Sequence, residues 1–416
     1  MKANVERIGR RIDRLAEIID PALPPYTRRA FTETFRQGRE WLAGELEDAG
    51  LTTGVDAGGN LVGQRAGSEA GLLPIALGSH SDTVMGGGRF DGIAGVVAAL
   101  EVAQVLGEEG KALRHPLWIY DCLAEEPTDY GVSCIGSRAL AGTLTEEMLA
   151  LSDEAGETLA EGLRRVGGDP ELALRGPIHG PRPLAAFMEL HIEQGPVLEG
   201  ASLPVGVVSG VVGIRRMRIT VTGQADHAGT TPMTQRRDAL AGAAELIAAI
   251  HREGRAEYER NGLVATVGHL INRPNAPNVV PAQVEMIFES RCDDMAAVRA
   301  FTEGMVASVD TVMREWGLKL EATLIGDVQP TPFADPIRGV LRDAALEAGL
   351  EFREMQSGAG HDAMHIAAVA PAGMIFIPCR AGRSHASEEF ATPEAVATGT
   401  AVLMNAVLAL DRNPPP

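Results

Sequence analysis

The chain has 416 residues, which is more than one hydrophobic core usually organises, so we expect two domains. Its formal net charge of −19 opposes a phosphate backbone and argues against nonspecific binding of nucleic acid. No stretch approaches the roughly 18 consecutive apolar residues that a membrane span needs. We therefore expect a small-molecule partner, with no nucleic acid and no membrane.

The N-terminal segment 1–20 predicts a mature amphipathic helix rather than a secretory leader, because it contains no continuous apolar core. One face of that helix carries the apolar side chains of Val5, Ile8, Ile12, Leu15 and Ile18. The four cysteines lie far apart and lack CxxC spacing, which indicates reduced, buried thiols rather than disulfides or a thiolate metal site. These features predict a cytoplasmic location.

Solid apolar runs recur in the first half of the chain and near its end, and each is long enough for a strand that is buried on both faces. The runs span 72–79, 116–124, 183–190 and 372–379. Helical patterns alternate with them, for example at 93–110 and 394–410. We therefore predict an α/β fold with a mostly parallel sheet.

The middle of the chain has a different pattern, in the order β-α-β-β-α-β. Strands are predicted where apolar residues alternate with polar ones, at 217–223, 263–270, 283–291 and 318–326. Helices are predicted at 237–254 and 295–317. This order is that of a ferredoxin-like α+β domain, and it predicts an inserted domain at 213–328. Residues 1–212 and 329–416 then form the sheet domain that carries the catalytic site.

Possible metal ligands follow the buried strands. The glycine-rich segment 78–92, GSHSDTVMGGGRFDG, comes directly after an apolar run. One candidate side chain lies just past the end of each of the four predicted strands, namely His80, Glu126, His191 and His385. Because ligands gather at the carboxyl ends of strands in open α/β sheets, we expect these side chains to converge on one crevice.

Imidazole and carboxylate groups are ligands that Zn²⁺, Mn²⁺ or Co²⁺ accept. Asp91, at the start of the helix after the glycine-rich loop, can bridge two ions. With an open position on each ion, a shared water can supply hydroxide near neutral pH. Glu125 then remains as the base that takes the proton from this water and returns it to the leaving amine.

Taken singly, each of these residues is more typical of a solvated surface or a packed core than of a ligand. The glycine-rich run 86–92 could also be an ordinary loop or a phosphate cradle. It lacks the GK[ST] of a P-loop, however, and no GxGxxG opens the first strand–helix unit. The conjunction favours a metal site, because the buried strands deliver all the candidates to one end of the sheet.

A series of motifs extends over nearly the whole chain. The motifs are GSHSDTV with GGRFDG in 78–92, EE at 125–126, GSRALAG at 136–142, ELHIEQGPVLE at 189–199, DHAGTTPM at 226–233, PNVVP at 277–281, SGAGHDAM at 357–364 and SHASEE at 384–389. In this order they resemble the hydantoinase/carbamoylase branch of the dinuclear-metal amidohydrolases related to M20 peptidases. That branch includes N-carbamoyl-L-amino-acid hydrolases, β-ureidopropionases and allantoate amidohydrolases.

The resemblance implies two divalent metal ions per subunit, which can be Zn, Mn or Co. One ion would be held by His80, Asp91 and His191. The other would be held by Asp91, Glu126 and His385, so that Asp91 is shared.

The resemblance also implies Glu125 as general base and acid, and Asp82 as the residue that orients His80. The second role has a physical basis, because a metal-bound imidazole generally donates its other N–H to a carboxylate. Peptidases of the wider group commonly carry a carboxylate at the position of His191. The histidine therefore favours the carbamoylase branch.

In the family, the inserted domain is both lid and dimer surface, which implies a homodimer. His227 resembles a residue that stabilises the tetrahedral oxyanion from across the dimer, although it could be a plain turn residue. Arg291 resembles the residue that grips a substrate carboxylate, although it could form a surface salt bridge. Other positions that the family places near the substrate are Gln194, Asn278, Gly360 and His361. Gly360 would allow close backbone approach, while His361 could instead only shape its loop.

These observations predict a two-metal amidohydrolase that cleaves the C–N bond of an N-carbamoyl-L-amino acid or a related ureido acid bearing a carboxylate. An allantoate amidohydrolase or an N-acyl-amino-acid hydrolase could use the same site. A non-catalytic, metal-stabilised binding protein is the alternative from another class. Many family members follow the paired glutamates with Gly-Ser-Arg-Phe, whereas this chain has Pro127, Thr128, Asp129 and Tyr130. Because this segment lies beside the pocket in the family, the departure puts the usual substrates in doubt.

Overall fold

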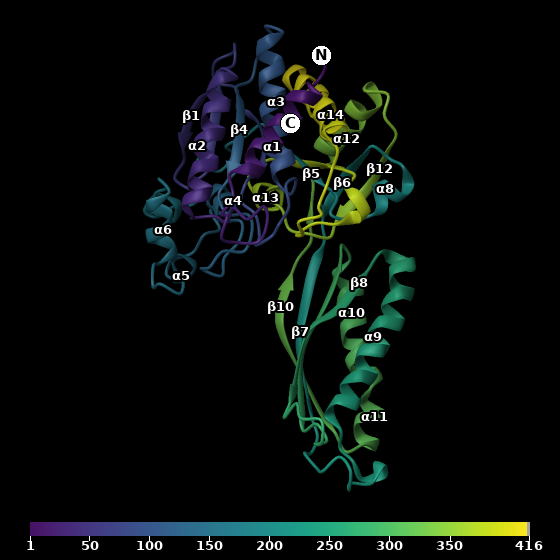
Figure 1. The fold of residues 1–416 in the computed structure, drawn as a ribbon. Helices are drawn as coiled ribbons and strands as arrows, with labels where there is room; N and C mark the ends of the chain where they lie inside the picture. Colours follow the sequence, from purple (N-terminus) through teal and green to yellow (C-terminus); the bar gives the residue numbers. More distant parts are fainter. Residues whose placement is uncertain (414–416) are drawn as a thin grey trace. The chain divides into compact units, whose positions relative to one another are not determined.

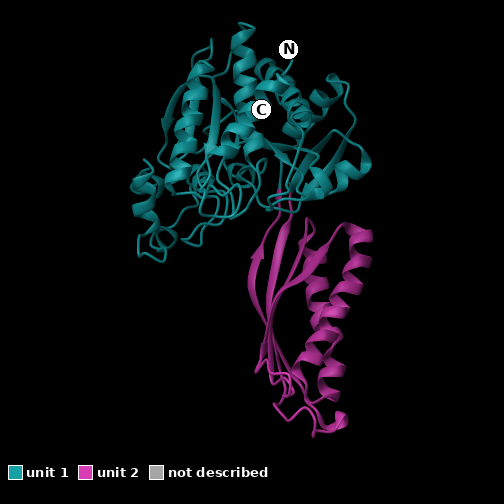
Figure 2. Cartoon of the chain, in the orientation of Figure 1, with its two compact units in different colours: residues 1–210, 332–416 teal, residues 211–331 magenta. Residues whose placement is uncertain are grey.

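The computed structural model describes residues 1–413, and these divide into two compact units. Unit 1 contains residues 1–210 and the described residues from 332 onward, while unit 2 contains residues 211–331 (Figure 2). The chain thus leaves unit 1, completes unit 2 and then returns. Each unit has its own hydrophobic core.

Unit 1 is built on one nine-stranded sheet. Its strands are β1 (Thr52–Val55), β2 (Leu61–Arg65), β3 (Ile75–His80), β4 (Leu117–Cys122), β5 (Ala186–Ile192), β6 (Val205–Val211), β11 (Thr331–Pro332), β12 (Phe352–Ser357) and β13 (Ala372–Ile377). They lie in the order β1-β2-β4-β3-β5-β13-β6-β11, with β12 also paired to β6. Figure 1 labels β1, β4, β5, β6 and β12 of these strands. The central strands β4, β3, β5 and β13 run parallel to one another. The predicted α/β fold with a mostly parallel sheet is confirmed.

Helices bury the central strands, in which every residue of β3, β5 and β13 is buried. The helices of unit 1 are α1 (Val5–Glu17), α2 (Glu33–Asp48), α3 (Ile93–Glu108), α4 (Ile135–Ala141), α5 (Glu146–Leu149), α6 (Leu159–Arg165), α7 (Pro170–Ala173), α8 (Val197–Ala201), α12 (Asp335–Glu347), α13 (Asp362–Ile366) and α14 (Pro393–Arg412), with a short 3-10 turn, η2 (Arg380–Gly382). Residues of α1, α3, α12 and α14 share one large apolar cluster with the sheet. The solid apolar runs of the sequence therefore form strands, because both of their faces are covered.

The helix α14 is long and apolar enough to cross a membrane by length and composition alone. Its side chains Val402, Leu403 and Val407 are buried in the large apolar cluster of unit 1. The helix packs against α3 and α12. In this fold α14 is a core helix.

The helix α3 is apolar on nearly every side, as expected of a buried helix, but it carries the completely buried Glu101. Arg7 Nε donates to this carboxylate at 2.7 Å, and Arg11 Nη1 donates at 3.1 Å. Arg7 Nη2 and the backbone N–H of Asn4 each donate to the other carboxylate oxygen at 2.8 Å. The N-terminal helix is thus fixed to the core by ion pairs as well as by its apolar face.

Unit 2 contains a four-stranded antiparallel sheet in the order β10-β7-β9-β8, with the chain order β-α-β-β-α-β of ferredoxin-like domains. The predicted single helix 295–317 is wrong, because the chain leaves the helix at Val309 and forms two helices. Burial alternates along one central strand, so one sheet face packs on helices and the other is open. The elements are β7 (Gly213–Thr222), η1 (Met233–Gln235), α9 (Ala239–Asn261), β8 (Val264–Arg273), β9 (Gln283–Cys292), α10 (Met295–Ser308), α11 (Asp310–Glu315) and β10 (Lys319–Val328).

Candidate metal centre

The carboxyl ends of β3 and β5 place two buried histidines at one edge of the sheet. His80 is the last residue of β3, and His191 is the penultimate residue of β5. The prediction that both follow their strands is wrong, because backbone pairing continues through them, with His80 opposite Cys122 and His191 opposite Phe376. The ring nitrogens nevertheless lie at the strand ends, where the loops after β4 and β13 bring further candidates.

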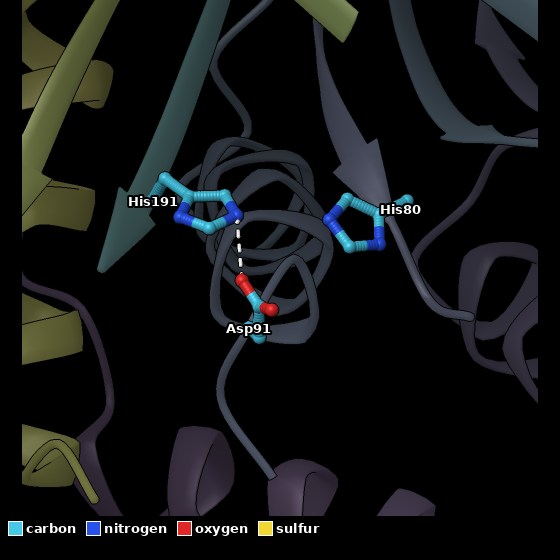
Figure 3. Close-up of side chains that lie close together, drawn as sticks. All are labelled: His80, Asp91 and His191. Atoms are coloured by element: carbon cyan, nitrogen blue, oxygen red, sulfur yellow. Dashed lines mark ion pairs between the residues drawn. The ribbon is translucent and has the colours of Figure 1, made fainter. Parts of the chain in front are cut away.

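Two groups of side chains that share Asp91 lie close enough to hold metal ions. One group is His80, Asp91 and His191, and the other is Asp91, Glu126 and His385, with the ligand atoms of each within 4.8 Å of one another. A third group within the same distance is Glu189, His191 and His361, which shares His191 with the first. Nε2 of His191 lies 3.1 Å from Oδ1 of Asp91, and Nε2 of His385 lies 3.0 Å from Oδ2. Figure 3 shows the rings of His80 and His191 on either side of the Asp91 carboxylate. Each carboxylate oxygen of Asp91 thus faces a histidine of a different group, as a bridging ligand requires.

The two buried histidines present the nitrogen that a metal needs. Nδ1 of His191 lies 2.9 Å from the carbonyl oxygen of Ile192, and Nδ1 of His80 lies 3.1 Å from that of Asp82. Because a carbonyl oxygen only accepts, each Nδ1 carries a proton, and in the neutral ring the lone pair is on Nε2. The backbone N–H of Gly92 donates to Nε2 of His191 at 3.1 Å. A Cβ at Gly92 would lie 2.4 Å from the ring of His80, so only glycine fits there.

The carboxylates of the cluster also fit a bound cation. Oε1 of Glu126 is buried without a hydrogen-bond partner in the described chain and lies 3.3 Å from Nε2 of His385. Burial, together with the negative charge of Asp91, raises the pKa of Glu126 to about 7. A hydrogen bond to Asp91 raises the pKa of His385 to about 9. A positive ion between these groups would relieve the repulsion between the two carboxylates, so the donor set fits two divalent ions.

Glu125 belongs to neither ligand group, although it precedes Glu126 in the chain. Its Oε2 lies 3.6 Å from Nε2 of His80, and the thiol of Cys134 donates to its Oε1 at 3.6 Å. Burial raises the pKa of Glu125 well above its ordinary value, against the opposing charge of His80. A buried carboxyl group that touches the cluster without joining a ligand group is placed to accept and return a proton.

Asp82 connects the end of β3 to the paired glutamates. Its Oδ1 accepts the backbone N–H of Glu125 at 3.3 Å, and its Oδ2 accepts that of Glu126 at 3.2 Å. Oδ1 also lies 3.5 Å from Nδ1 of His80, although the carbonyl oxygen of Asp82 is closer to that nitrogen. The hold on the glutamate backbone was not expected from the sequence. It fixes the two glutamates relative to the histidine.

Three non-glycine residues beside the cluster have left-handed backbones. They are Ala124 with φ 53°, Gln194 with φ 57° and His385 with φ 54°. Such residues cost on the order of 1–3 kcal/mol each and persist only where their surroundings hold them. The loops after β4, β5 and β13 are therefore held in one particular shape around the cluster.

Of the predicted substrate residues in the 357–364 motif, His361 lies against the cluster of candidate metal ligands. Its ring contacts that of His191 edge to face at 4.5 Å between centroids, and its Nε2 lies 2.8 Å from Oγ of Ser357. Burial, reinforced by the charge of His191, lowers the pKa of His361 well below its ordinary value, so the ring is neutral. Gly360 is exposed, and a Cβ there would meet only Sδ of Met364 at 3.5 Å. Packing within the chain therefore does not require glycine at 360.

Two predicted residues of unit 2, His227 and Asn278, are neighbours. Residue 227 forms an isolated bridge with Val279, and the N–H of Ala228 donates to the carbonyl oxygen of Asn278 at 3.0 Å. Both predicted side chains are exposed. They form one polar surface beyond Gln283, the first residue of β9.

Arg291 lies at the other end of β9, opposite Ile214 in the sheet. Its Nε donates to Oε1 of Glu289 at 2.6 Å, which is the surface ion pair considered as its alternative role. At about 3.3 Å per residue, the strand separates Arg291 from Gln283 by roughly 26 Å. The structure therefore does not bring Arg291 and His227 together within one chain.

The segment by which the chain departs from the family pattern contacts the protein outside the cluster. Asp129 pairs with Arg29 at 2.6 Å. Tyr130 donates its hydroxyl to Glu157 at 2.6 Å and packs edge-on against Phe31 at 5.2 Å between ring centroids. These side chains fasten the loop to its neighbours.

Gln194 and Glu389 contact Asp91, and Ser384 contacts both of them; Ser384 and Glu389 belong to the SHASEE motif and received no role from the sequence. Gln194 Nε2 donates to Oδ1 of Asp91 at 3.0 Å. Oε1 of the buried Glu389 accepts the backbone N–H of Asp91 at 3.0 Å, and its Oε2 accepts the hydroxyl of Ser384 at 2.8 Å. In the sequence, the only sign of a role for Glu389 was that this carboxylate lies four residues after the predicted ligand His385.

Comparison with known proteins gives consistent matches over the whole chain. Residues 66–409 match the family described as Peptidase family M20/M25/M40. The N-carbamoyl-L-amino-acid amidohydrolase of Paenarthrobacter aurescens is 38% identical over 412 residues, which is 99% of each chain. The ureidoglycolate hydrolase of Arabidopsis thaliana is 35% identical over 94% of this chain and 83% of its own length. The crystal structure of a hydantoinase/carbamoylase family amidase from Burkholderia multivorans matches with a TM-score of 0.92 and 36% identity, covering 100% of this chain and 99% of that one.

Proposed function

Because this chain belongs to peptidase family M20/M25/M40, we propose that it uses two metal ions to hydrolyse an N-carbamoyl-L-amino acid or a related ureido acid. It is a hydrolase of C–N bonds related to the hydantoinase/carbamoylase amidases. The products are the free amine, carbon dioxide and ammonia. The observation that carries the proposal is the pair of donor groups that share Asp91. The similarity to the Paenarthrobacter amidohydrolase supports the substrate class.

The two ions would be held by the five side chains of the cluster, His80, Asp91, Glu126, His191 and His385. Zn, Mn or Co suits this mixture of imidazole and carboxylate ligands. When bound, such ions polarise a carbonyl group and make a nucleophile available from water near neutral pH. The chain itself has to orient the substrate and move the proton.

Glu125 moves the proton. Its carboxyl group lies beside the cluster but outside both ligand groups, so it can accept the proton of the attacking water. The same group returns that proton to the nitrogen of the breaking C–N bond, because an amine leaves far more readily when it is protonated. Asp82 supports this step by holding the backbone of Glu125.

Unit 2 acts as lid and dimerisation domain, and Arg291 binds the substrate carboxylate with its guanidinium group. Within one chain His227 and Asn278 lie beyond Gln283, which β9 separates from Arg291 by roughly 26 Å, so a small substrate held by Arg291 does not reach them. The partner subunit of a homodimer supplies them instead. There His227 donates to the developing oxyanion.

The second candidate keeps the site but changes the ureido acid. The similarity to the Arabidopsis ureidoglycolate hydrolase favours it, and an allantoate-type substrate belongs to the same class. An N-acyl-amino-acid hydrolase would leave the ligand groups unchanged and release a carboxylic acid. A metal-stabilised binding protein would hold the ions without turnover.

The four free, buried cysteines support the proposed cytoplasmic location of the enzyme.

A substrate screen with product analysis tests the proposal. The protein is loaded with Mn²⁺, Co²⁺ or Zn²⁺ and incubated with N-carbamoyl, ureido and N-acyl derivatives of one L-amino acid. Ammonia and carbon dioxide are expected from the carbamoyl or ureido compounds. A carboxylic acid from the N-acyl compound alone contradicts the proposed substrate class. Loaded protein without turnover of any compound supports the binding-protein alternative.

A further inference from the structure

A ring of hydrogen bonds encloses the backbone and side chain of Asp91, and three of its members lie outside the proposed ligand set. Gln194 Nε2 donates to Oδ1 of Asp91 at 3.0 Å and to Oγ of Ser384 at 3.3 Å. Ser384 donates its hydroxyl proton to Oε2 of Glu389 at 2.8 Å. Oε1 of Glu389 accepts the backbone N–H of Asp91 at 3.0 Å, which closes the ring.

The directions of these bonds are consistent with one another. The amide of Gln194 has two N–H donors, and two acceptors, Asp91 and Ser384, lie within reach. The hydroxyl of Ser384 accepts from that amide and has one proton left for Glu389. A flipped Gln194 amide would turn its oxygen toward the Asp91 carboxylate, which is repulsive and fixes the orientation shown here.

Glu389 is buried inside the protein and does not lie on its surface. It is 2% exposed, and its Oε1 also accepts the backbone N–H of Phe90 at 2.8 Å. Gly88 makes room for it, because a Cβ there would lie 2.5 Å from the Glu389 carboxylate. The rings of Phe90 and Phe390 pack edge to face at 5.4 Å between centroids, beside the ring of hydrogen bonds.

The hydrogen-bonded ring joins the three loops that follow β3, β5 and β13. It fixes both the backbone and one carboxylate oxygen of Asp91, whose two oxygens face His191 and His385. Ser384 directly precedes His385, which has a left-handed backbone that needs support. Orientation of ligands by outer hydrogen bonds commonly changes metal affinity or activity 10- to 100-fold.

We propose that Glu389, Ser384 and Gln194 are positioning residues that set the bridging geometry of Asp91 and the place of His385. This inference rests on the proposed function, in which Asp91 is shared by two ions. Because the Gln194 amide nitrogen is engaged, only its Oε1, which has no partner in the described chain, is available to a substrate.

The test compares Glu389→Gln, Glu389→Ala and Ser384→Ala with the matched controls Glu388→Gln and Ser387→Ala. The control residues are adjacent and exposed, and Ser387 donates to Glu388 away from the cluster. Metal affinity is measured by competition between Zn²⁺ binding and a chelator, and folding is measured as the thermal midpoint of the metal-free protein. Kinetics at saturating metal complete the set.

We expect Zn²⁺ affinity to fall about tenfold in Glu389→Gln and Ser384→Ala and toward 100-fold in Glu389→Ala. The metal-free midpoint and KM should change little, and both controls should match the wild type. Unchanged affinity and kcat in Glu389→Ala and Ser384→Ala would overturn the inference. So would a lowered midpoint with normal affinity, which marks a structural role only. Wild-type protein that binds no Zn²⁺ would instead refute the proposed function, so the two failures are distinguishable.

Discussion

Replacing Glu125 with glutamine isolates the proton transfer. The amide keeps the shape of the side chain and an oxygen that can accept the thiol of Cys134, so folding should be preserved. Glu125 lies outside both ligand groups, so the variant should still bind two ions. The neighbouring Glu126 is occupied as a proposed ligand, and Asp82 holds the backbone of both glutamates, so neither replaces it.

General base catalysis contributes about 10²- to 10⁴-fold, which corresponds to about 3–5 kcal/mol of transition-state stabilisation at about 1.36 kcal/mol per tenfold. We therefore expect kcat for ammonia release to fall at least 100-fold in Glu125→Gln, with KM changed little because Arg291 binds the substrate. The assay measures ammonia under saturating substrate, beside the metal content of the same sample. A kcat within about threefold of wild type at two bound ions would refute the assignment of Glu125 as the base.

Arg291→Ala should raise KM about 10- to 100-fold with a smaller effect on kcat, since a charge-assisted hydrogen bond contributes about 1.5–3 kcal/mol. An unchanged KM across carboxylate-bearing substrates would contradict the role of Arg291 in substrate binding. Inactive Glu125→Gln and His227→Ala proteins, mixed and allowed to exchange subunits, should recover about a quarter of wild-type activity, because one of the two sites in each mixed dimer is intact. No recovery despite exchange would argue against a shared site. Chelation should abolish activity and lower the thermal midpoint, and both should return with Mn²⁺, Co²⁺ or Zn²⁺. Glu101→Gln should lower the free energy of unfolding by about 3–5 kcal/mol in denaturant titrations, because Arg7 and Arg11 lose a buried counter-charge, while kcat of the folded enzyme stays the same. A loss below about 1 kcal/mol would show that the ion pairs of Glu101 add little.

The sequence predicted the parts of unit 1 that depend on burial. Solid apolar runs became β3, β4, β5 and β13 because both faces of these strands are covered. The same rule located the candidate ligands at the carboxyl ends, since parallel neighbours end at one edge. It misplaced His80 and His191 by a residue or two, because backbone pairing does not stop where apolar side chains stop.

Details that depend on loop shape escaped prediction. Ser384 donates to Glu389 across the left-handed backbone of His385, a conformation that no residue pattern predicts. The break at Val309 between α10 and α11 interrupts an otherwise continuous helical period. The separation of Arg291 from His227 follows from the length and register of β9, which motif spacing does not give.

The central claim is a pair of metal ions bridged by Asp91. The most direct measurement is a crystal structure of the protein reconstituted with Zn²⁺ or Mn²⁺, with data collected at the metal absorption edge. We expect two anomalous peaks per chain, one bound by His80 and His191 and the other by Glu126 and His385, with one oxygen of Asp91 about 2.0–2.2 Å from each in the zinc protein. A single peak, or two peaks of which only one contacts Asp91, would contradict the account.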